Sequence, residues 1–532
     1  MILLTFAMSC DVPVEDETYN RPVGEGPWIL VDLWHTRIQN PEDYRLEKGV
    51  YAYQGVYGFW RLFDQLETSG YNWHSIRTMP LSAPRLEGFD ILFINLVHDA
   101  RPDFTAEEIK VIQEFVHGGG GLFVIADHTN VYRHAERVNP ILEPMGIEIA
   151  YTTAVDFPPQ HSVAGKGWIM IWDFDDHPVT DGVDMISFQT GGSFYTDHGV
   201  AFTSTDSFGD FWDEEQEAGY YGNWTWDGDE DIEPLGPLPV VAAAEYGQGR
   251  VVVVGDQNIF GDAWINFGNN FEIALNGFEW LAKKESDPRR LRSARRRGTN
   301  IGLESSGNFF NTGRTAHDGY YVTFGHFHRD LEITAHATTA LTTNHDVHGF
   351  LAPTDRYSDS DVDTIRRELE GGKKVFLTFE ADQISGATAH LLNALAPDFS
   401  LEVDGVTFAD KDVLGEVPTR RLTGPSAITS EAMDVDGISL ASVALPRGQE
   451  ERLRYLLDVR SDWGEPLVHS QRGDKYVDIA RRKVVGEGEL IIFIQDGFWR
   501  GRTMGSKETE RPTDLNKDAI EFLYRFLDYL KN

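Results

Sequence analysis

The stretch Phe104-Thr-Ala-Glu-Glu-Ile-Lys-Val-Ile-Gln-Glu-Phe-Val-His117, with Gly118 to Gly121 and Leu122-Phe-Val-Ile-Ala-Asp127 after it, decides the fold class. Its first part has apolar residues at helical spacing, with Thr105 as the expected N-cap and acidic residues in the first turn. The glycines end this helix, and the apolar run after them predicts a buried strand of a parallel sheet. A helix that leads into such a strand is typical of an α/β protein.

The second half of the chain repeats this order of elements. Residues 357–370 again have helical spacing, glycines 371–372 follow, and the apolar run 375–382 again ends in Ala-Asp. The matching order predicts that one structural unit occurs twice.

A second pair of segments supports the repeat. Residues 246–256 and 485–496 each join a Gly-x-Gly turn to an apolar strand that ends in Asp. Each is followed by an amphipathic stretch, 269–281 in the first copy and 515–530 in the second, which predicts a terminal helix. Chance agreement of four ordered elements is improbable, so we expect a duplicated unit.

The segments upstream of these complete the predicted sheet of the first copy. We expect strands at 28–34, 71–77 and 89–96 and a helix at 57–69. Alternating strands and helices predict a parallel, Rossmann-like sheet with right-handed crossovers. The expected divisions are a tether (1–27), a first domain (28–284), a basic linker (285–299) and a degenerate second copy (300–532).

Charge restricts the partners. The 532 residues include 47 basic and 85 acidic ones, which gives a formal charge of -38. Such a chain repels nucleic acid and anionic membrane faces, so we expect no nucleic-acid partner. A heavily hydrated surface explains the acidity, and an acidic face for a cationic partner is the alternative.

Cys10 is the only cysteine, so an internal disulfide and a thiol-rich zinc site are excluded. It follows an apolar run and Ser9 and precedes an acidic, proline-bearing stretch, which resembles the end of a bacterial lipoprotein signal peptide. A basic n-region is missing and Met8 fits poorly beside the cleavage point. We expect a lipid anchor at Cys10 in the bacterial envelope, with membrane contact through that anchor alone; a cytoplasmic protein is the alternative.

Four segments carry a resemblance to a known family: 118–130, 139–147, 177–183 and 249–256. They resemble class I glutamine amidotransferase-like domains, in particular the non-amidase branch of gliding-motility-associated and intraflagellar transport proteins. The resemblance is clear over 28–282 and weak over 300–530. It implies two tandem flavodoxin-like sheets flanked by helices in three layers, and it implies little about chemistry.

Amidotransferases of this class carry a cysteine nucleophile on a tight turn after a central strand. Asp127 and His128 stand at the corresponding turn here, and Cys10 lies far outside the domain. Glutamine hydrolysis needs that thiolate, so we expect no amidotransferase activity.

Polar residues follow the predicted strands of the first copy, where ligands bind in open α/β sheets. These are His35, His98, Asp99, Asp127, His128, Asp256 and Asn258. Imidazoles with carboxylates suit a divalent metal, zinc or calcium, and the three histidines are the candidate ligands of a metal-dependent hydrolase. The alternative is structural: strand-end Asp residues cap the next turn, and strand-end His residues bind loop carbonyls.

The loop 219–233 combines aromatic residues with carboxylates. Such a loop can stack on sugar rings or hold calcium, although the EF-hand spacing fails, and packing over its own domain is the alternative. The expected function is a non-catalytic, envelope-associated protein that binds a protein or polysaccharide partner; the alternative is the metal-dependent hydrolase.

Overall fold

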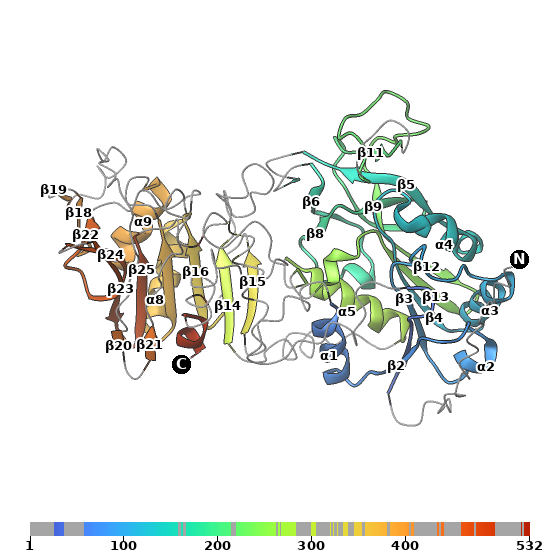
Figure 1. Ribbon diagram of the computed structural model, residues 1–532, viewed down its shortest axis with the longest axis horizontal. Coiled ribbons are helices and arrows are strands. Elements are labelled where there is room, and N and C mark those ends of the chain that lie inside the picture. Colours follow the sequence, from blue (N-terminus) through green and yellow to red (C-terminus); the bar gives the residue numbers. More distant parts are fainter. Residues whose placement is uncertain are drawn as a thin grey trace, which may run out of the picture.

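Two α/β bodies lie side by side in the computed structural model, one from each half of the chain (Figure 1). The structure describes residues 26–36, 58–157, 161–162, 166–213, 220–261, 264–265, 268–283, 299–304, 320, 323, 327, 333–338, 345–353, 357–379, 384–403, 406–408, 433–435, 438–440, 459–472, 475–494, 499, 523 and 526–531. The predicted anchor at Cys10, most of the basic linker, and Asp382 and Asp496 lie outside these residues.

The first sheet has eight strands in the order β2-β1-β3-β4-β13-β12-β10-β7. Their bounds are β1 (Trp28–Asp32), β2 (Asn72–Ile76), β3 (Ile91–Ile94), β4 (Gly121–Ile125), β7 (Asp173–Phe174), β10 (Gly199–Phe202), β12 (Pro239–Tyr246) and β13 (Gly249–Val254). The strands from β2 to β13 are parallel to their neighbours, as the sequence predicts.

The prediction of a wholly parallel sheet is wrong, because β12, β10 and β7 run antiparallel to their neighbours. The reason lies in the Gly-x-Gly turn at 247–249. Gly247 adopts a φ of +61°, and the two residues between β12 and β13 close a hairpin, which only antiparallel strands can share. The α/β class is correct, and the sheet is mixed.

Helices cover both faces of the first sheet. They are α1 (Trp60–Thr68), α2 (Ala83–Leu86), α3 (Ala106–His117), α4 (His134–Leu142) and α5 (Asn270–Leu281). Residues of α1 and α5 form one apolar core with the sheet, and residues of α2, α3 and α4 form the other. Thr105 is the N-cap of α3, as predicted, and closes a capping box with Glu108.

Two smaller sheets belong to the same half. One joins β11 (Phe208–Phe211), β5 (Ile147–Val155) and β9 (Gly192–Thr196), and the other pairs β6 (Trp168–Ile171) with β8 (Ile186–Gln189). Backbone hydrogen bonds from Thr129 to Thr152 (3.1 Å) and from Gly192 to Gly255 (2.7 Å) attach the β11-β5-β9 sheet to the ends of the main strands. Figure 1 shows it beyond that end of the main sheet.

The second half has a seven-stranded sheet in the order β15-β14-β16-β17-β25-β24-β23. Its strands are β14 (Thr299–Glu304), β15 (Ile333–Thr338), β16 (Val347–Leu351), β17 (Lys374–Thr378), β23 (Glu465–Arg472), β24 (Lys475–Val485) and β25 (Gly488–Phe493). The strands from β15 to β25 are parallel and the last two antiparallel. Order and directions therefore match the first seven positions of the first sheet.

Helices α8 (Asp359–Glu370) and α9 (Gly386–Leu395) pack on this second sheet around one apolar core. Short strands form two further sheets, β19-β18-β22 and β20-β21. Their bounds are β18 (Leu401–Val403), β19 (Val406–Phe408), β20 (Met433–Val435), β21 (Ile438–Leu440) and β22 (Val459–Arg460).

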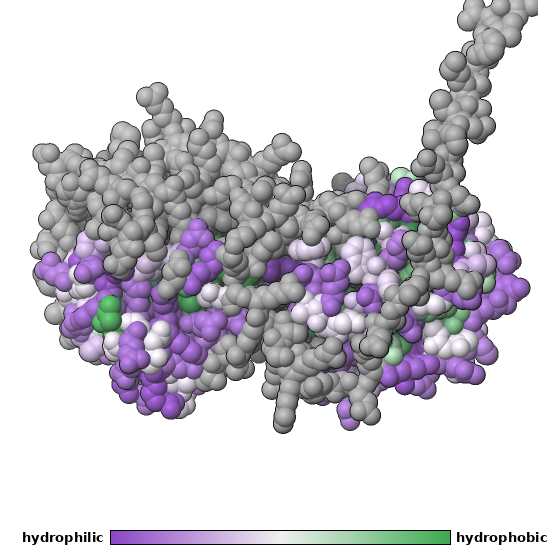
Figure 2. All heavy atoms as spheres, turned by 90° about the horizontal axis from the view of Figure 1, so that it is seen from below, coloured by the Kyte–Doolittle hydropathy of each residue, from purple (hydrophilic) through white to green (hydrophobic). Residues whose placement is uncertain are grey.

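On the face drawn in Figure 2, hydrophilic residues dominate and hydrophobic ones form only small spots. Within the described ranges, no helix combines the length and the apolar character that a membrane span requires.

Candidate functional site

The turn after β4 has an unusual backbone. Thr129, Tyr132 and Arg133 have φ values of 51°, 55° and 57°, in the left-handed region that side chains other than glycine rarely adopt. Each such residue costs on the order of 1–3 kcal/mol and persists only where its surroundings hold it.

His134, the first residue of α4, holds this turn in place. Its Nδ1 donates to the carbonyl of Val131 at 2.8 Å, and its Nε2 accepts the N–H of Asp127 at 3.2 Å. These two bonds use both ring nitrogens and require the neutral ring, and burial lowers the pKa of His134 to about 4. His134 therefore joins the end of β4 to the start of α4.

Asp127 and Asp256 end two adjacent strands. Ile125 of β4 pairs with Val254 of β13. Asp127 and Asp256 each follow that pair by two residues, so they occupy matching positions after the two strands. Their side chains are buried, with exposed fractions of 1% and 0%. Burial and the neighbouring Asp256 raise the pKa of Asp127 well above its usual range, and burial raises that of Asp256 to about 7. Near neutral pH the pair therefore holds a proton.

Backbone groups occupy the oxygens of these carboxyl groups. Asp127 Oδ1 accepts the N–H of His128 at 2.7 Å. Asp256 accepts the N–H of Asn258 at 2.7 Å and that of Gln189 at 2.5 Å. Asn258 donates from its side chain to the carbonyl of Gln189 at 3.1 Å, so it fixes the same residue. The three side chains shape the loops at this edge.

His128 lies in the same turn and is also uncharged. Burial, and next the neighbouring His134, lower its pKa to about 3. Its Nδ1 lies 3.2 Å from the Thr129 hydroxyl, and its ring is 4.6 Å from that of Tyr221. At neutral pH it carries no positive charge with which to balance the Asp pair.

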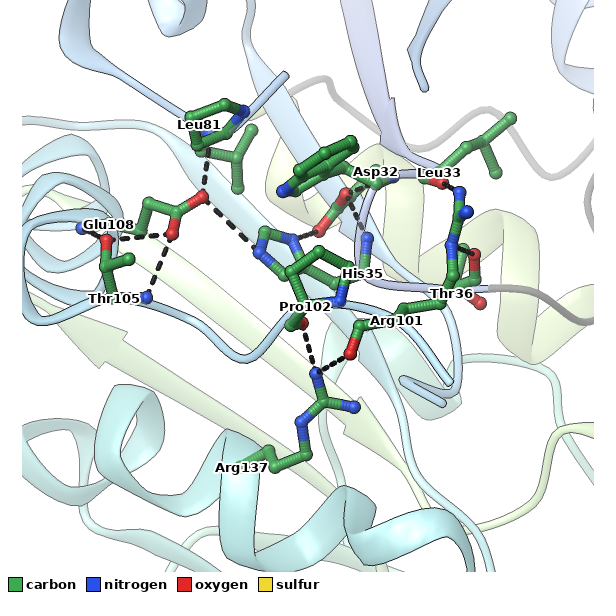
Figure 3. Close-up of polar contacts among 12 residues, drawn as sticks. Asp32, Leu33, His35, Thr36, Leu81, Arg101, Pro102, Thr105, Glu108 and Arg137 are labelled. Carbon is green, nitrogen blue, oxygen red and sulfur yellow. Dashed lines mark hydrogen bonds and ion pairs between the residues drawn. The ribbon is translucent and has the colours of Figure 1, made fainter. Parts of the chain in front are cut away.

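His35 belongs to a separate buried network, drawn in Figure 3. Its Nδ1 lies 2.7 Å from Asp32 Oδ2, and its Nε2 lies 3.3 Å from Glu108 Oε1, a pairing distance without hydrogen-bond geometry. Its ring stacks on Phe104 at 3.8 Å. Glu108 also accepts the N–H groups of Leu81 and Thr105, so this network binds β1 to the start of α3.

His98 and Asp99 lie on the next loop. The Nδ1 of His98 accepts the N–H of Ala100 at 3.0 Å and lies 2.9 Å from Asp99 Oδ1. The ring stacks on Tyr132 at 4.2 Å. The guanidinium of Arg137 donates to the carbonyl of His98 at 2.7 Å. It also donates to the carbonyls of Arg101 and Pro102, which holds this loop (Figure 3).

The three histidines predicted as metal ligands are therefore held by different partners: His35 by Asp32 and Phe104, His98 by Ala100 and Tyr132, and His128 by Thr129 and Tyr221. Over the described ranges, no three His, Cys, Asp or Glu side chains are grouped so that they could hold a metal ion. The structure does not bring the three imidazoles together as a ligand set.

The predicted aromatic loop covers this edge, as far as it is described (220–233). The carbonyl of Tyr220 accepts a bond from the Thr129 hydroxyl at 3.1 Å, and Tyr221 packs on His128 and on Trp224. Inside the loop, Glu233 accepts the N–H groups of Phe211 and Asp227. Part of the loop thus packs over its own domain, above the Asp127 turn.

Comparison with known proteins gives matches to solved structures alone. No family model matches the chain, and no curated protein matches it. The N-terminal domain of mmIFT52 is similar at 16% identity and a TM-score of 0.35, over 49% of this chain and 99% of that domain. A ThuA-like protein from Bacteroides uniformis is similar at 13% identity and a TM-score of 0.28, over 49% and 95%.

A second ThuA-like protein, from Parabacteroides merdae, is similar at 12% identity and a TM-score of 0.28, over 49% of this chain and 92% of that one. Each of these likenesses is at low sequence identity and extends over about half of this chain.

Sequence reasoning missed two residues that organise this edge, His134 and Glu108. His134 stands seven residues after Asp127, at the start of a helix that the sequence pattern did not single out. Glu108 was expected only as an acidic residue of the first helical turn, and the capping-box spacing from Thr105 was the available signal for its fixed position.

Proposed function

We propose that this chain is a non-catalytic binding or scaffold protein whose amidotransferase-like unit does no chemistry at the carboxyl edge of its first sheet. One observation carries the proposal: the polar side chains at this edge are engaged by the chain itself. His134 and the Asp127–Asp256 pair bind loop backbone, and the 220–233 loop lies over them.

The residue types at the turn after β4 support the same conclusion. A nucleophile there requires a thiol or an activated hydroxyl, and the turn carries Asp127, His128 and Thr129. The Thr129 hydroxyl donates to the Tyr220 carbonyl, and the nearby His128 ring faces the Tyr221 ring. The His128 Nδ1 lies 3.2 Å from the Thr129 hydroxyl, but that hydroxyl gives its single proton to the Tyr220 carbonyl. Nδ1 can therefore only donate to the Thr129 oxygen and does not act as its base in this arrangement.

The matching strand orders of the two sheets support a tandem, flavodoxin-like arrangement, in which the second half serves as a platform. In this proposal the first half contributes the binding surfaces, and the partner is a protein or a polysaccharide of the cell envelope.

Turnover measurements test the absence of catalysis. The full chain is incubated with glutamine and with chromogenic ester, phosphate and glycoside substrates, with and without added Zn²⁺ or Ca²⁺. We expect no product above the level given by the Asp127→Asn and His128→Ala variants. Turnover by the parent chain that either substitution abolishes would contradict the proposal.

Fractionation of cells tests the envelope location separately. If Cys10 carries a lipid, the parent chain sediments with membranes and the Cys10→Ser variant moves to the soluble fraction. A Ser9→Ala variant is the matched control and should stay with the membranes. Equal distribution of Cys10→Ser and the parent chain rules out this anchor.

A further inference from the structure

Exposed apolar side chains are concentrated in one segment. Of the large apolar side chains that are exposed in the described part of the chain, all but Val484 lie between residues 151 and 235. They are Tyr151, Phe157, Trp172, Tyr195, Phe211, Tyr220, Tyr221, Trp226, Ile232 and Leu235. This segment is inserted between α4 and β12 and carries β5, β9 and β11 (Figure 1). An apolar surface localised in this way is typical of a binding region.

A groove of about 510 Å³ lies within this region. Tyr195, Thr196 and Asp197 line it from β9 and the turn after it, while Pro234, Leu235 and Pro237 line it from the chain that enters β12. Tyr195 and Leu235 have exposed fractions of 45% and 46%, so both are accessible to a ligand. Proline fixes its own φ, so the proline-bearing wall is rigid before a ligand arrives.

A carboxylate accompanies the aromatic rings on this surface. Glu148 of β5 is paired with Tyr195 of β9, and it is exposed like Tyr195. Burial, and next the Glu148 carboxylate, raise the pKa of Tyr195; Glu148 contributes in the same sense at Tyr151. Both phenol groups therefore lie near one carboxylate, beside the groove that contains Asp197.

These groups suit an oligosaccharide better than they suit nucleic acid, an acidic polysaccharide or a membrane surface. A sugar ring has an apolar C–H face that packs on an aromatic ring, and hydroxyl groups that donate to carboxylates. Nucleic acid and acidic polysaccharides are repelled by Asp197, Glu148 and the net charge of -38. Membrane surfaces attract basic amphipathic segments, and this one is acidic.

We propose that the groove between β9 and the 234–239 segment binds an oligosaccharide without negative charge, with Tyr195 as the stacking ring and Asp197 as a hydrogen-bond acceptor. The inference rests on the proposed binding function and names its ligand class. Leu235 and the prolines line the same groove from the 234–239 segment, so a sugar unit on the Tyr195 ring would lie near them.

Calorimetric titration of the full chain tests this assignment. The probes are cellohexaose, hexa-N-acetylchitohexaose, a fully deacetylated chitosan hexamer and, as the anionic comparison, hexagalacturonate. We expect at least one of the first three to bind and hexagalacturonate to show no heat. Tyr195→Ala should weaken that binding at least tenfold, or about 1.4 kcal/mol, whereas Tyr195→Phe should retain most of it.

Two further variants serve as a control and as a test of the charge of the ligand. Val484→Ala removes an exposed apolar side chain of the second half and should bind as the parent chain does. Asp197→Asn should weaken binding of the chitosan hexamer more than that of an uncharged hexamer, if the ligand is cationic. Because Tyr195 is exposed, its variants should fold, which circular dichroism verifies.

The proposal is overturned if none of the three uncharged or cationic hexamers binds, or if Tyr195→Ala binds as tightly as the parent chain. Size-exclusion chromatography gives a third outcome: a dimer that Leu235→Asp dissociates would assign the groove to a second copy and also overturn it. Release of reducing ends from a bound hexamer would contradict the non-catalytic function but leave the groove assignment intact, so the two failures are distinguishable.

Discussion

Helices α3 and α8 occupy the same place in their two halves, and they begin with the same device. Each precedes a central strand, β4 or β17, and each opens with a capping box, from Thr105 to Glu108 in α3 and from Ser358 to Asp361 in α8. The N3 carboxylates differ. Glu108 is buried and also contacts Leu81 and His35, whereas Asp361 is partly exposed and binds Ser358.

This difference shows that the two halves share a type of helix start, and that the first half connects it to further buried polar side chains. In α8 the cap serves only its own helix among the contacts that the structure gives. In α3 the N3 carboxylate, Glu108, also belongs to a buried network with Asp32 and His35. Of the three experiments below, the first and third test that contrast and the second tests another buried polar group of the first half; they run from the largest expected effect to the smallest.

Removing the two N3 carboxylates should have very different consequences. Glu108→Ala leaves the N–H groups of Leu81 and Thr105 without their carboxylate acceptor, and each buried donor left unsatisfied costs about 1–3 kcal/mol. Asp361→Ala removes a partly exposed cap partner and should cost about 1 kcal/mol. Urea denaturation measures both free energies of unfolding. Equal losses would mean that the buried network adds nothing to the cap.

The buried Asp pair should make the stability of the first half depend on pH. Because the pKa of Asp256 is about 7 in the folded chain and ordinarily near 3.8, the folded state keeps a proton that the unfolded state releases. The contribution of Asp256 to stability is therefore full below about pH 4 and falls as the pH rises to 7, by about 1.4 kcal/mol per unit of pKa shift.

The Asp256→Asn variant cannot ionise at this position and should lack much of that fall. Relative to the parent chain it should gain stability from pH 4 to pH 7 and change little above pH 7, as measured by urea denaturation at each pH. Asp206→Asn, at an exposed site, is the control. A constant difference between Asp256→Asn and the parent chain across this range would show that the buried pair does not hold the proton.

The smallest contrast concerns the caps themselves. Thr105→Ala and Ser358→Ala should each lower the free energy of unfolding by roughly 0.5–2 kcal/mol. Each hydroxyl also donates to its N3 carboxylate, Thr105 to Glu108 at 2.8 Å and Ser358 to Asp361 at 2.6 Å. The loss should be larger for Thr105, because Glu108 is buried and also accepts the N–H of Leu81, whereas Asp361 is partly exposed. Thermal or urea unfolding of the two variants measures this. A larger loss for Ser358→Ala would reverse the order that the contacts indicate.

Much of the framework could be predicted from sequence because it rests on local periodicity. The apolar spacing of α3 and the glycines before β4 reproduce their observed bounds closely. The antiparallel part of the sheet was missed because a two-residue turn was interpreted only as the start of β13. The strand before it, β12, has a continuous apolar run that carries no direction of its own.

The position of the candidate site in the fold could be predicted from the sequence, but the arrangement of its side chains could not. Sequence spacing places His35, His98 and Asp127 at the ends of strands, where the structure also has them. It cannot identify the partners that lie far along the chain: Glu108 is 73 positions from His35, and Gln189 is 67 from Asp256. Distant contacts of this kind are set by tertiary packing.

The reversed direction of β12 has one more consequence. Because β12 runs against β13, its first residue, Pro239, lies at the edge where the parallel strands finish, and the 234–238 segment enters there beside β9. Apart from its hydrogen bonds with Thr203, Ser207 and Gly209, that segment joins the framework at the start of β12. Insertions or deletions in it would leave the paired residues of the central strands unchanged, so ligand preference could diversify among descendants of this chain without loss of folding.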